Sequence, residues 1–536
     1  MHSFSPLTPT VFLERTGRVF ANATAIRHDD GLVTYGNLLR RSRRLATVLR
    51  EHGVRYGDCI GLMSDNGPQV IEANFGIPGA GGVVVSLNPW LPTDDIVKQL
   101  QMVASRILIV SRACLQRHGL EALSGGGSRR LIGFGATPDK DATCIDYEDA
   151  IASAADEIPL NDMVRSEMDP IVVNFTSGTT GLPKGVVMSH RGAYLHALGQ
   201  VLMLGLTRQS RYLWTLPMFH VNGWGHIWSN AAVGAGQIMT EVPGPTEEEE
   251  TRFASLLGEA GVTHLAGAPR LLRRIVSAGA AASALKGCIV VTGGAAPTRP
   301  LLKQLEALGA TLIHQYGLNE TFGPYVVCEE QWDWAHEDSE SRAAFRARQG
   351  VAAIHAGTGL RVVDADGLDV PADGKTPGEV LMSGNTVALG YYNNPEATAR
   401  SFVNGWFHSG DLAVVHPDGY LEIKDRIKDL IYVETDYGWE NISSIEVENV
   451  LVQCPGVGDA ALIGLQTDDA QEGARLIAVI EASSQPAPSL EALHDYCERH
   501  LPVHMRPSRF VLSSIPKTAT GKTRKDLLVD RALREP

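Results

Sequence analysis

Short runs of β-branched and other apolar residues alternate with helix-like patterns through the first two thirds of this 536-residue chain. Buried strands are predicted at Val83–Leu87, Ile107–Val110, Ile171–Phe175, Ile289–Thr292 and Thr311–Ile313. Helices are predicted at Tyr35–His52, Thr246–Ala260 and Pro300–Leu308. Strands that alternate with helices usually form parallel sheets covered by those helices, so the pattern predicts an α/β architecture.

The pattern changes from about Gly357, where short strands separated by Asp-Gly turns replace the longer alternation. A charged cluster, Lys424–Asp429, follows, and after it comes a compact mixture of helix and strand patterns. We therefore expect a domain boundary at Asp425. Residues 1–425 are expected to form a large domain of layered sheets and helices with a β-rich subdomain, and residues 426–536 a small α+β domain.

Charge and composition disfavour several classes of function. The chain has 47 Lys and Arg residues against 61 Asp and Glu residues, a net charge of −14, which argues against binding to nucleic acid or an anionic membrane. Its seven cysteines stand singly, without the Cys-x-x-Cys pairs of zinc sites. Neither a signal-peptide pattern nor a long apolar stretch is present. We therefore expect a cytoplasmic protein without a nucleic-acid or membrane partner.

The most informative segment is Thr176–Gly185, which follows a predicted strand and contains four hydroxyl residues, three glycines and one lysine. Glycines let the backbone approach a polyphosphate, hydroxyls and N–H groups donate hydrogen bonds to it, and a lysine adds positive charge. It is not a Walker A loop, because Pro183 stands where that loop requires glycine. The residues expected to hold phosphates are Thr176, Ser177, Gly178, Thr179, Thr180, Gly181 and Lys184.

This segment resembles the signature loop of the adenylate-forming superfamily, which includes acyl-CoA synthetases, firefly luciferase and the adenylation domains of peptide synthetases. Further segments match in the family's order, so the resemblance covers nearly the whole chain. It implies that ATP and Mg²⁺ convert a carboxylic acid into acyl-AMP with release of pyrophosphate. It also implies that the small domain is mobile about a hinge at Asp425, and a homodimer is expected by the same analogy.

His314–Thr321 is similar to the family's second signature. The similarity implies that Tyr316 stacks on adenine, that Glu320 is the carboxylate on the magnesium side together with Thr176, and that Asn319 replaces the usual threonine. Gly293–Pro297 is similar to the backbone ledge that holds adenine. The remaining residues assigned to nucleotide binding on this basis are Gly294, Ala295, Ala296, Gln315, Gly317 and Thr321.

Trp406–Asp411 resembles the ribose-binding motif, with Asp411 accepting hydrogen bonds from the ribose hydroxyls and Arg426 completing the grip. Pro516–Lys522 matches the last signature, whose lysine, Lys522, is expected to bridge the substrate carboxylate and the α-phosphate. His220 resembles a gating residue beside the acyl pocket, although a histidine before a helix is also a common cap. The expected catalytic residues are Lys522, Lys184, Glu320 and His220.

The segment after the hinge departs from the family. Related acyl-CoA synthetases read Ser-Gly-Gly-Glu-Asn-Ile-Ser-Ser there, whereas this chain has Trp439 in place of a glycine and several added residues within Val433–Ser444. An indole fills volume that a glycine leaves open for the pantetheine arm of CoA. We therefore expect the acyl group to pass to an amino acid or small amine, as in amide-forming ligases such as coronafacic acid ligase, with CoA as the alternative acceptor.

A third alternative, from a different class, is a nucleotide-binding module without catalysis. The presence of Glu320, Asp411, Arg426 and Lys522 argues against it. Which acid is activated is not indicated by the sequence, because pockets built from backbone and apolar side chains discriminate only modestly between acids.

Overall fold

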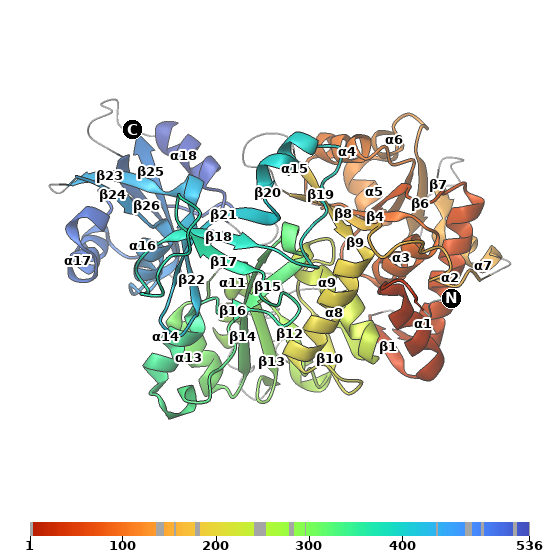
Figure 1. Cartoon of the computed structure of the whole chain (residues 1–536), viewed down its shortest axis with the longest axis horizontal. Coiled ribbons are helices and arrows are strands. Elements are labelled where there is room, and N and C mark those ends of the chain that lie inside the picture. The colour runs from red at the N-terminus through yellow and green to blue at the C-terminus, as the bar shows by residue number, and fades with distance from the viewer. Residues whose placement is uncertain are drawn as a thin grey trace.

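The computed structural model describes residues 4–29, 31–135, 144–154, 157–176, 183–240, 253, 255–277, 284–294, 296–435, 438–466, 474–483, 487–517 and 523–534. Layered sheets and helices form a large N-terminal part, and a smaller mixed part follows at the C-terminus (Figure 1). The predicted α/β class is confirmed. None of the helices in these ranges has the length and apolar character that crossing a bilayer requires.

The first large sheet has nine strands, and the six from β14 to β1 in sheet order are parallel to one another. In spatial order the strands are β16 (Val351–Ala352), β15 (Gly323–Val327), β14 (Thr311–Leu318), β13 (Ile289–Gly293), β12 (His264–Ala266), β10 (Arg211–Trp214), β11 (Gly236–Met239), β1 (Thr24–His28) and β2 (Gly31–Thr34).

The second large sheet has eight strands, and its pairings are parallel except those of β9 with β8 and with β19 at one edge. Its spatial order is β19 (Gly390–Tyr391), β9 (Lys184–Ser189), β8 (Pro170–Thr176), β4 (Val83–Ser86), β3 (Cys59–Met63), β5 (Ile107–Ser111), β6 (Arg130–Phe134) and β7 (Cys144–Asp146).

The two sheets share one core with the helices α1 (Thr10–Val19), α2 (Tyr35–Glu51), α3 (Pro68–Gly79), α8 (His190–Leu204) and α9 (Val221–Val233). Alternation along each strand explains how a sheet is buried on both faces. Tyr212 and Trp214 of β10 point into this shared core, whereas Leu213 between them packs on the other face. That outer face is covered by α11 (Pro269–Ser277) and α13 (Arg299–Ala307).

The outer face of the second sheet is covered by α4 (Thr93–Met102), α5 (Arg112–His118) and α6 (Leu120–Ser124). The remaining helical elements of the large part are α7 (Tyr147–Ser153), α14 (Ser339–Ala347), α15 (Pro395–Ser401) and the 3₁₀ turns η1 (Asn319–Thr321) and η2 (Trp334–His336).

The β-rich region predicted after Gly357 forms a third sheet with its own core. Its strands are β17 (Leu360–Val363), β18 (Gly378–Met382), β20 (Phe402–Val403), β21 (Trp406–Val415) and β22 (Leu421–Arg426). The last strand runs through the predicted boundary at Asp425 and pairs with β21. The position of that boundary therefore stays a prediction.

The elements after β22 gather at the end of the molecule opposite the N-terminus (Figure 1). Their two cores contain only residues from Ile431 onward. They are η3 (Ile427–Asp429), β23 (Ile431–Thr435), β24 (Gly438–Ile442), α16 (Ser444–Leu451), β25 (Val457–Gln466), β26 (Ala474–Ala482), α17 (Leu490–His500), η4 (Val503–Met505), β27 (Arg509–Leu512) and α18 (Lys525–Arg534).

The five buried strands predicted from apolar runs correspond to β4, β5, β8, β13 and β14. Two of the three predicted helices match α2 and α13 within one residue at each end. Of the third, Thr246–Ala260, only part lies within the described residues, and residues 255–259 are helical there.

Gly359, which precedes β17, offers a test of packing in the third sheet. A Cβ atom at this position would overlap the carbonyl oxygen of Ser383 and crowd the Tyr325 hydroxyl, which donates hydrogen bonds to both segments. Because overpacking of this kind costs about 1–3 kcal/mol, Gly359→Ala should lower the midpoint of thermal unfolding. The control is Gly258→Ala, a helical glycine whose Cβ would meet only ordinary contacts, and it should be neutral or stabilising.

Candidate active site

The predicted phosphate loop closes a hairpin between β8 and β9. Thr176 at the end of β8 is paired with Lys184 at the start of β9, and the Thr176 hydroxyl donates to the Lys184 carbonyl oxygen at 3.5 Å. The two ends of the loop are therefore fixed side by side at the edge of the second sheet. Five residues assigned to phosphate binding lie outside the described residues: Ser177, Gly178, Thr179, Thr180 and Gly181.

Lys184 and Glu320 meet around Tyr391. The Lys184 ammonium lies 4.8 Å from the centre of the Tyr391 ring, and the Tyr391 hydroxyl donates to Glu320 Oε1 at 2.8 Å. Tyr391 is held there because β19 pairs with β9, which begins at Lys184. Burial raises the pKa of Glu320, and the Tyr391 hydroxyl and the Lys184 charge oppose that rise. The arrangement thus brings a carboxylate and an ammonium together around one tyrosine side chain.

A second carboxylate, Asp411, is held by two residues that the sequence also predicted. The Tyr316 hydroxyl donates to Asp411 Oδ2 at 2.6 Å, and Arg426 Nε lies 3.5 Å from Oδ1. Asp411 and Arg426 are register partners on β21 and β22. Burial raises the pKa of Asp411, which is only 5% exposed, while Tyr316 and Arg426 act against the rise. The structure thus brings together Tyr316, Asp411 and Arg426.

The rest of the second signature forms the tight turn between β14 and β15. Gly317 is required there, because a Cβ would overlap the carbonyl oxygen of Gly323 across the hairpin. The Thr321 hydroxyl is fully buried, accepts from Leu318 N at 2.9 Å and donates to the Gly323 carbonyl oxygen at 2.8 Å. The Thr321 hydroxyl therefore stabilises this turn, and the role in nucleotide binding assigned to it stays a prediction.

Asn319, the departure from the family pattern, connects this turn to the phosphate loop. Its Nδ2 lies 3.5 Å from Asn174 Oδ1 and 3.5 Å from the Phe175 carbonyl oxygen, both on β8. The Asn319 amide, which replaces the hydroxyl of the usual threonine, thus links the second signature to the strand that leads into the phosphate loop.

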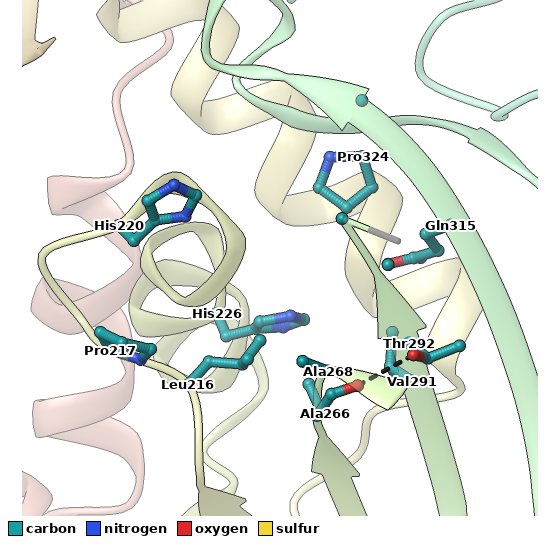
Figure 2. Close-up of a pocket in the computed structure, with 14 residues that line it drawn as sticks. Leu216, Pro217, His220, His226, Ala266, Ala268, Val291, Thr292, Gln315 and Pro324 are labelled. Atoms are coloured by element: carbon teal, nitrogen blue, oxygen red, sulfur yellow. Dashed lines mark hydrogen bonds between the residues drawn. The ribbon is translucent and has the colours of Figure 1, made fainter. Parts of the chain in front are cut away.

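A pocket with about 570 Å³ of empty space, part of it open to solvent, is lined in part by Gln315 and Gly317 of the second signature (Figure 2). It opens at the carboxyl ends of β12, β13 and β14, where ligands bind in parallel sheets. Four residues from the two segments predicted for nucleotide binding line it. Gly293 and Gly294 come from Gly293–Pro297, and Gln315 and Gly317 come from His314–Thr321. Gly294 has a positive φ of 80°, a conformation that favours glycine. Ala295 lies outside the described residues. Ala296 is half-buried and does not line the pocket.

His220 stands immediately before α9, and its side chain lines the same pocket (Figure 2). Burial lowers the pKa of His220 to about 4, so the imidazole is neutral at physiological pH. A neutral imidazole can donate or accept one hydrogen bond, but it carries no charge for the phosphates. Its gating role stays a prediction.

Lys522 lies outside the described residues, as does most of the last signature. Its two flanks are nevertheless joined, because Lys517 and Thr523 form an antiparallel bridge. The post-hinge segment forms the β23–β24 hairpin, in which Trp439 is paired with Glu434.

The family model described as AMP-binding enzyme matches residues 13–392, and that of the AMP-binding enzyme C-terminal domain matches residues 446–522. The chain belongs to the AMP-binding enzyme family. The resemblance to adenylate-forming enzymes is thereby confirmed, and this AMP-binding enzyme is an AMP-forming carboxylic acid ligase.

Relatives of this AMP-binding enzyme extend along its whole length. A 4-hydroxybutyrate–CoA ligase of Metallosphaera sedula is 36% identical and covers 99% of this chain and 95% of its own. A benzoate CoA ligase structure from Burkholderia xenovorans is 26% identical, with a TM-score of 0.83 and coverage of 97% and 99%. The amide bond synthetase McbA from Marinactinospora thermotolerans, 24% identical with a TM-score of 0.82 and coverage of 98% and 99%, shares the fold. These relatives do not support the amine acceptor expected from Trp439.

Sequence reasoning missed Tyr391 and His226. Tyr391 contacts both Lys184 and Glu320, and His226 lines the pocket from α9. A Tyr in a two-residue strand and a His within an apolar helix give no local pattern that would have singled them out.

Five histidines, three of them buried and two half-buried, have a pKa lowered to about 4 by removal from water, against an ordinary value of 6.5: His190, His226 and His314 are buried, and His220 and His355 are half-buried. Since the unfolded chain binds more protons between these values, the free energy of unfolding should fall as pH falls through this window. The slope is up to about 1.4 kcal/mol per pH unit for each histidine.

Urea unfolding at about pH 7 and about pH 5 measures this dependence. The variant His314→Asn should show a smaller difference between the two pH values than the parent. The exposed His500 gives the control, and His500→Gln should leave the difference unchanged. A parent protein equally stable at both values would contradict the prediction.

Proposed function

We propose that this AMP-binding enzyme is an acyl-CoA synthetase, which activates a carboxylic acid as acyl-AMP and passes the acyl group to the thiol of CoA. The observation that carries the proposal is the likeness to a CoA ligase at 36% identity over 99% of the chain. The cluster of Lys184 and Glu320 and the cluster of Tyr316, Asp411 and Arg426 support it, since they offer separate places for phosphates and ribose.

In the first step, a carboxylate oxygen of the acid attacks the α-phosphorus of ATP. The new P–O bond forms as the bond to the β-phosphate oxygen breaks, and pyrophosphate leaves with that electron pair. Such a reaction needs positioning and neutralisation of phosphate charge. Lys184 and the backbone of residues 176–184 would hold the phosphates, and Lys522 would neutralise charge that develops in the transition state.

Glu320 and Thr176 are the residues that would hold Mg²⁺. In the described part of the chain, no group of three His, Cys, Asp or Glu side chains could hold a metal by itself. This fits a magnesium ion that takes one carboxylate from the protein and other oxygens from phosphates and water. When bound, the ion would supply positive charge to the phosphates.

Asp411 would accept hydrogen bonds from the ribose hydroxyls, with Arg426 balancing its charge and the Tyr316 hydroxyl fixing its orientation. The Tyr316 ring would face adenine above Gly294, Ala295 and Ala296, with Gln315, Gly317 and Thr321 behind it. These assignments rest on the family motifs and on the contacts described above.

In the second step the CoA thiol displaces AMP, and we propose that the domain of residues 426–536 rotates about Asp425 between the steps. Asp425 is suited to a hinge, because its Oδ2 accepts from Ser444 N and from Ser444 Oγ, each at 2.7 Å, at the start of α16. The hinge residue is thus tied to the small domain, while its strand β22 pairs with the large one. A cytoplasmic location and a homodimer remain predictions.

The reaction product tests the acceptor. Given ATP, magnesium, a pool of organic acids and either CoA or mixed amino acids, the enzyme should form an acyl-CoA thioester, AMP and pyrophosphate, identified by mass spectrometry. Lys522→Ala should stop pyrophosphate release, whereas Lys375→Ala, at an exposed turn, should not. An amide formed with amino acids, and no thioester, would show instead that the acceptor is an amine.

Asp411→Asn tests the ribose site. Loss of charge-assisted hydrogen bonds should raise the KM for ATP about 10- to 100-fold, because such bonds contribute about 1.5–3 kcal/mol each. The matched control is Asp418→Asn, whose surface ion pair with Arg348 lies elsewhere, and it should leave the KM for ATP unchanged. A parent-like KM for ATP in a folded Asp411→Asn enzyme would remove Asp411 from the site.

A further inference from the structure

Four polar side chains line the pocket beside the nucleotide residues, those of His220, His226, Thr292 and Gln315, and the Thr292 hydroxyl already donates to the Gly267 carbonyl oxygen at 2.9 Å. His226 from α9 and Gln315 from β14 line it from two sides, and Figure 2 shows the His226 ring directed into the space between them. The neighbouring walls are small or apolar, formed by residues such as Ala266, Ala268 and Val291. A pocket that served only to bury an alkyl chain would have no use for two buried polar side chains.

His226 has hydrogen-bonding capacity that the described structure does not use. The residue is 3% exposed, and its Nδ1 has no hydrogen-bond partner among the described residues. Its ring lies 4.9 Å from that of Tyr212, whose buried hydroxyl also has no partner within the same ranges. A buried polar atom without a partner is unfavourable, so such a group calls for a ligand or water.

Gln315 is held in place from behind the pocket. The residue is 3% exposed, and its Nε2 donates to Gln200 Oε1 of α8 at 3.3 Å. The Gln315 amide is therefore positioned by a buried neighbour before any ligand arrives, which is how a binding group is preorganised.

His226 lies on α9 beyond the helix start, and the segment just before that start contacts β8. The Phe219 carbonyl oxygen, next to His220, accepts from Asn174 Nδ2 at 3.3 Å, and Asn174 precedes the loop on β8. His226 follows almost two turns further along α9, about 9 Å along the helix axis. An acid whose carboxylate faces the phosphates therefore directs its other end toward His226.

The electrostatics of the pocket favour a neutral group at that end. No Lys, Arg, Asp or Glu occurs among the residues that line the pocket in the described ranges. Burial lowers the pKa of both His220 and His226 to about 4, so each imidazole is neutral and offers one donor and one acceptor. A second carboxylate or an ammonium would be buried there without a counter-charge, which is strongly unfavourable.

We infer that the acid activated by this enzyme carries a neutral hydrogen-bonding group, a hydroxyl or an oxo group, at the end distant from its carboxylate, and that His226 recognises this group. The inference rests on the proposed function, because it takes the part of the pocket around His226, beyond the residues assigned to the nucleotide, as the place of the acid. It makes His226 a specificity-determining residue.

Pairs of acids of equal chain length provide the test. Butanoate is compared with 4-hydroxybutanoate and pentanoate with 4-oxopentanoate, while glutarate supplies a distal anion, and kcat/KM is measured as ATP-dependent AMP release with CoA. The polar neutral acid should exceed its alkyl partner about 10-fold or more, because one lost buried hydrogen bond is worth about that factor. Equal or higher kcat/KM for the alkyl acids, or the highest value for glutarate, would overturn the inference.

Variants locate the recognition. His226→Leu should lower the ratio of polar to alkyl kcat/KM about 10-fold, mainly through the KM of the polar acid. His264→Leu is the control, since His264 is equally buried, its nitrogens bond to Thr263 Oγ1 and the Leu204 carbonyl oxygen, and it does not line the pocket. In His264→Leu the ratio of polar to alkyl kcat/KM should equal that of the parent enzyme.

If His226→Leu does not fold, the ratio in the parent enzyme still decides, and His226→Asn provides a second polar variant. A ratio unchanged in folded His226→Leu would overturn the assignment to His226. Absence of AMP release with every acid would instead contradict the proposed function, whereas AMP release without preference contradicts this inference alone.

Discussion

Two carboxylates, the buried Asp411 and the half-buried Glu320, lie where the nucleotide of this enzyme is proposed to bind, and each accepts a hydrogen bond from a tyrosine hydroxyl. Tyr316 donates to Asp411 at 2.6 Å, and Tyr391 donates to Glu320 at 2.8 Å. A carboxylate taken out of water is unfavourable unless donors and opposite charges replace its hydration. Because each tyrosine lies far in sequence from its carboxylate, this requirement ties β14 to β21 and η1 to β19. The position of the site thus follows from satisfying two carboxylates that are largely withdrawn from water.

Strand direction explains why these segments can meet. The parallel strands β8, β12, β13 and β14 end at sheet edges that face the same region, and loops beyond those ends carry the signature residues. The antiparallel strands β9, β15 and β19 then fold back over these edges. Lys184 begins β9 and Tyr391 belongs to β19, so both residues reach the site only through the antiparallel pairing of these strands.

Much of the fold and part of the site could be predicted, because strand runs and signature loops are local in sequence. Asp411 and Arg426 are register partners on neighbouring strands, so even their meeting follows from the motif order. Tyr391 could not be found in this way, because pairing between β19 and β9 alone brings it to Glu320. The acceptor was predicted from the volume of one side chain, Trp439, and full-length relatives outweigh that single substitution.

The polar atoms around the pocket connect folding stability with selectivity. An apolar pocket separates acids that differ by one methylene by only about 1–3 kcal/mol, whereas a site with buried hydrogen-bonding groups rejects an analogue that leaves them unpaired far more strongly. In the described structure the Tyr212 hydroxyl, Gln200 Nε2 and His226 Nδ1 are buried without partners. Those atoms lower the stability of the empty enzyme, and an alkyl acid would leave that cost in place. An acid with a distal hydroxyl or oxo group removes part of it, so the same groups that weaken the fold favour one class of substrate.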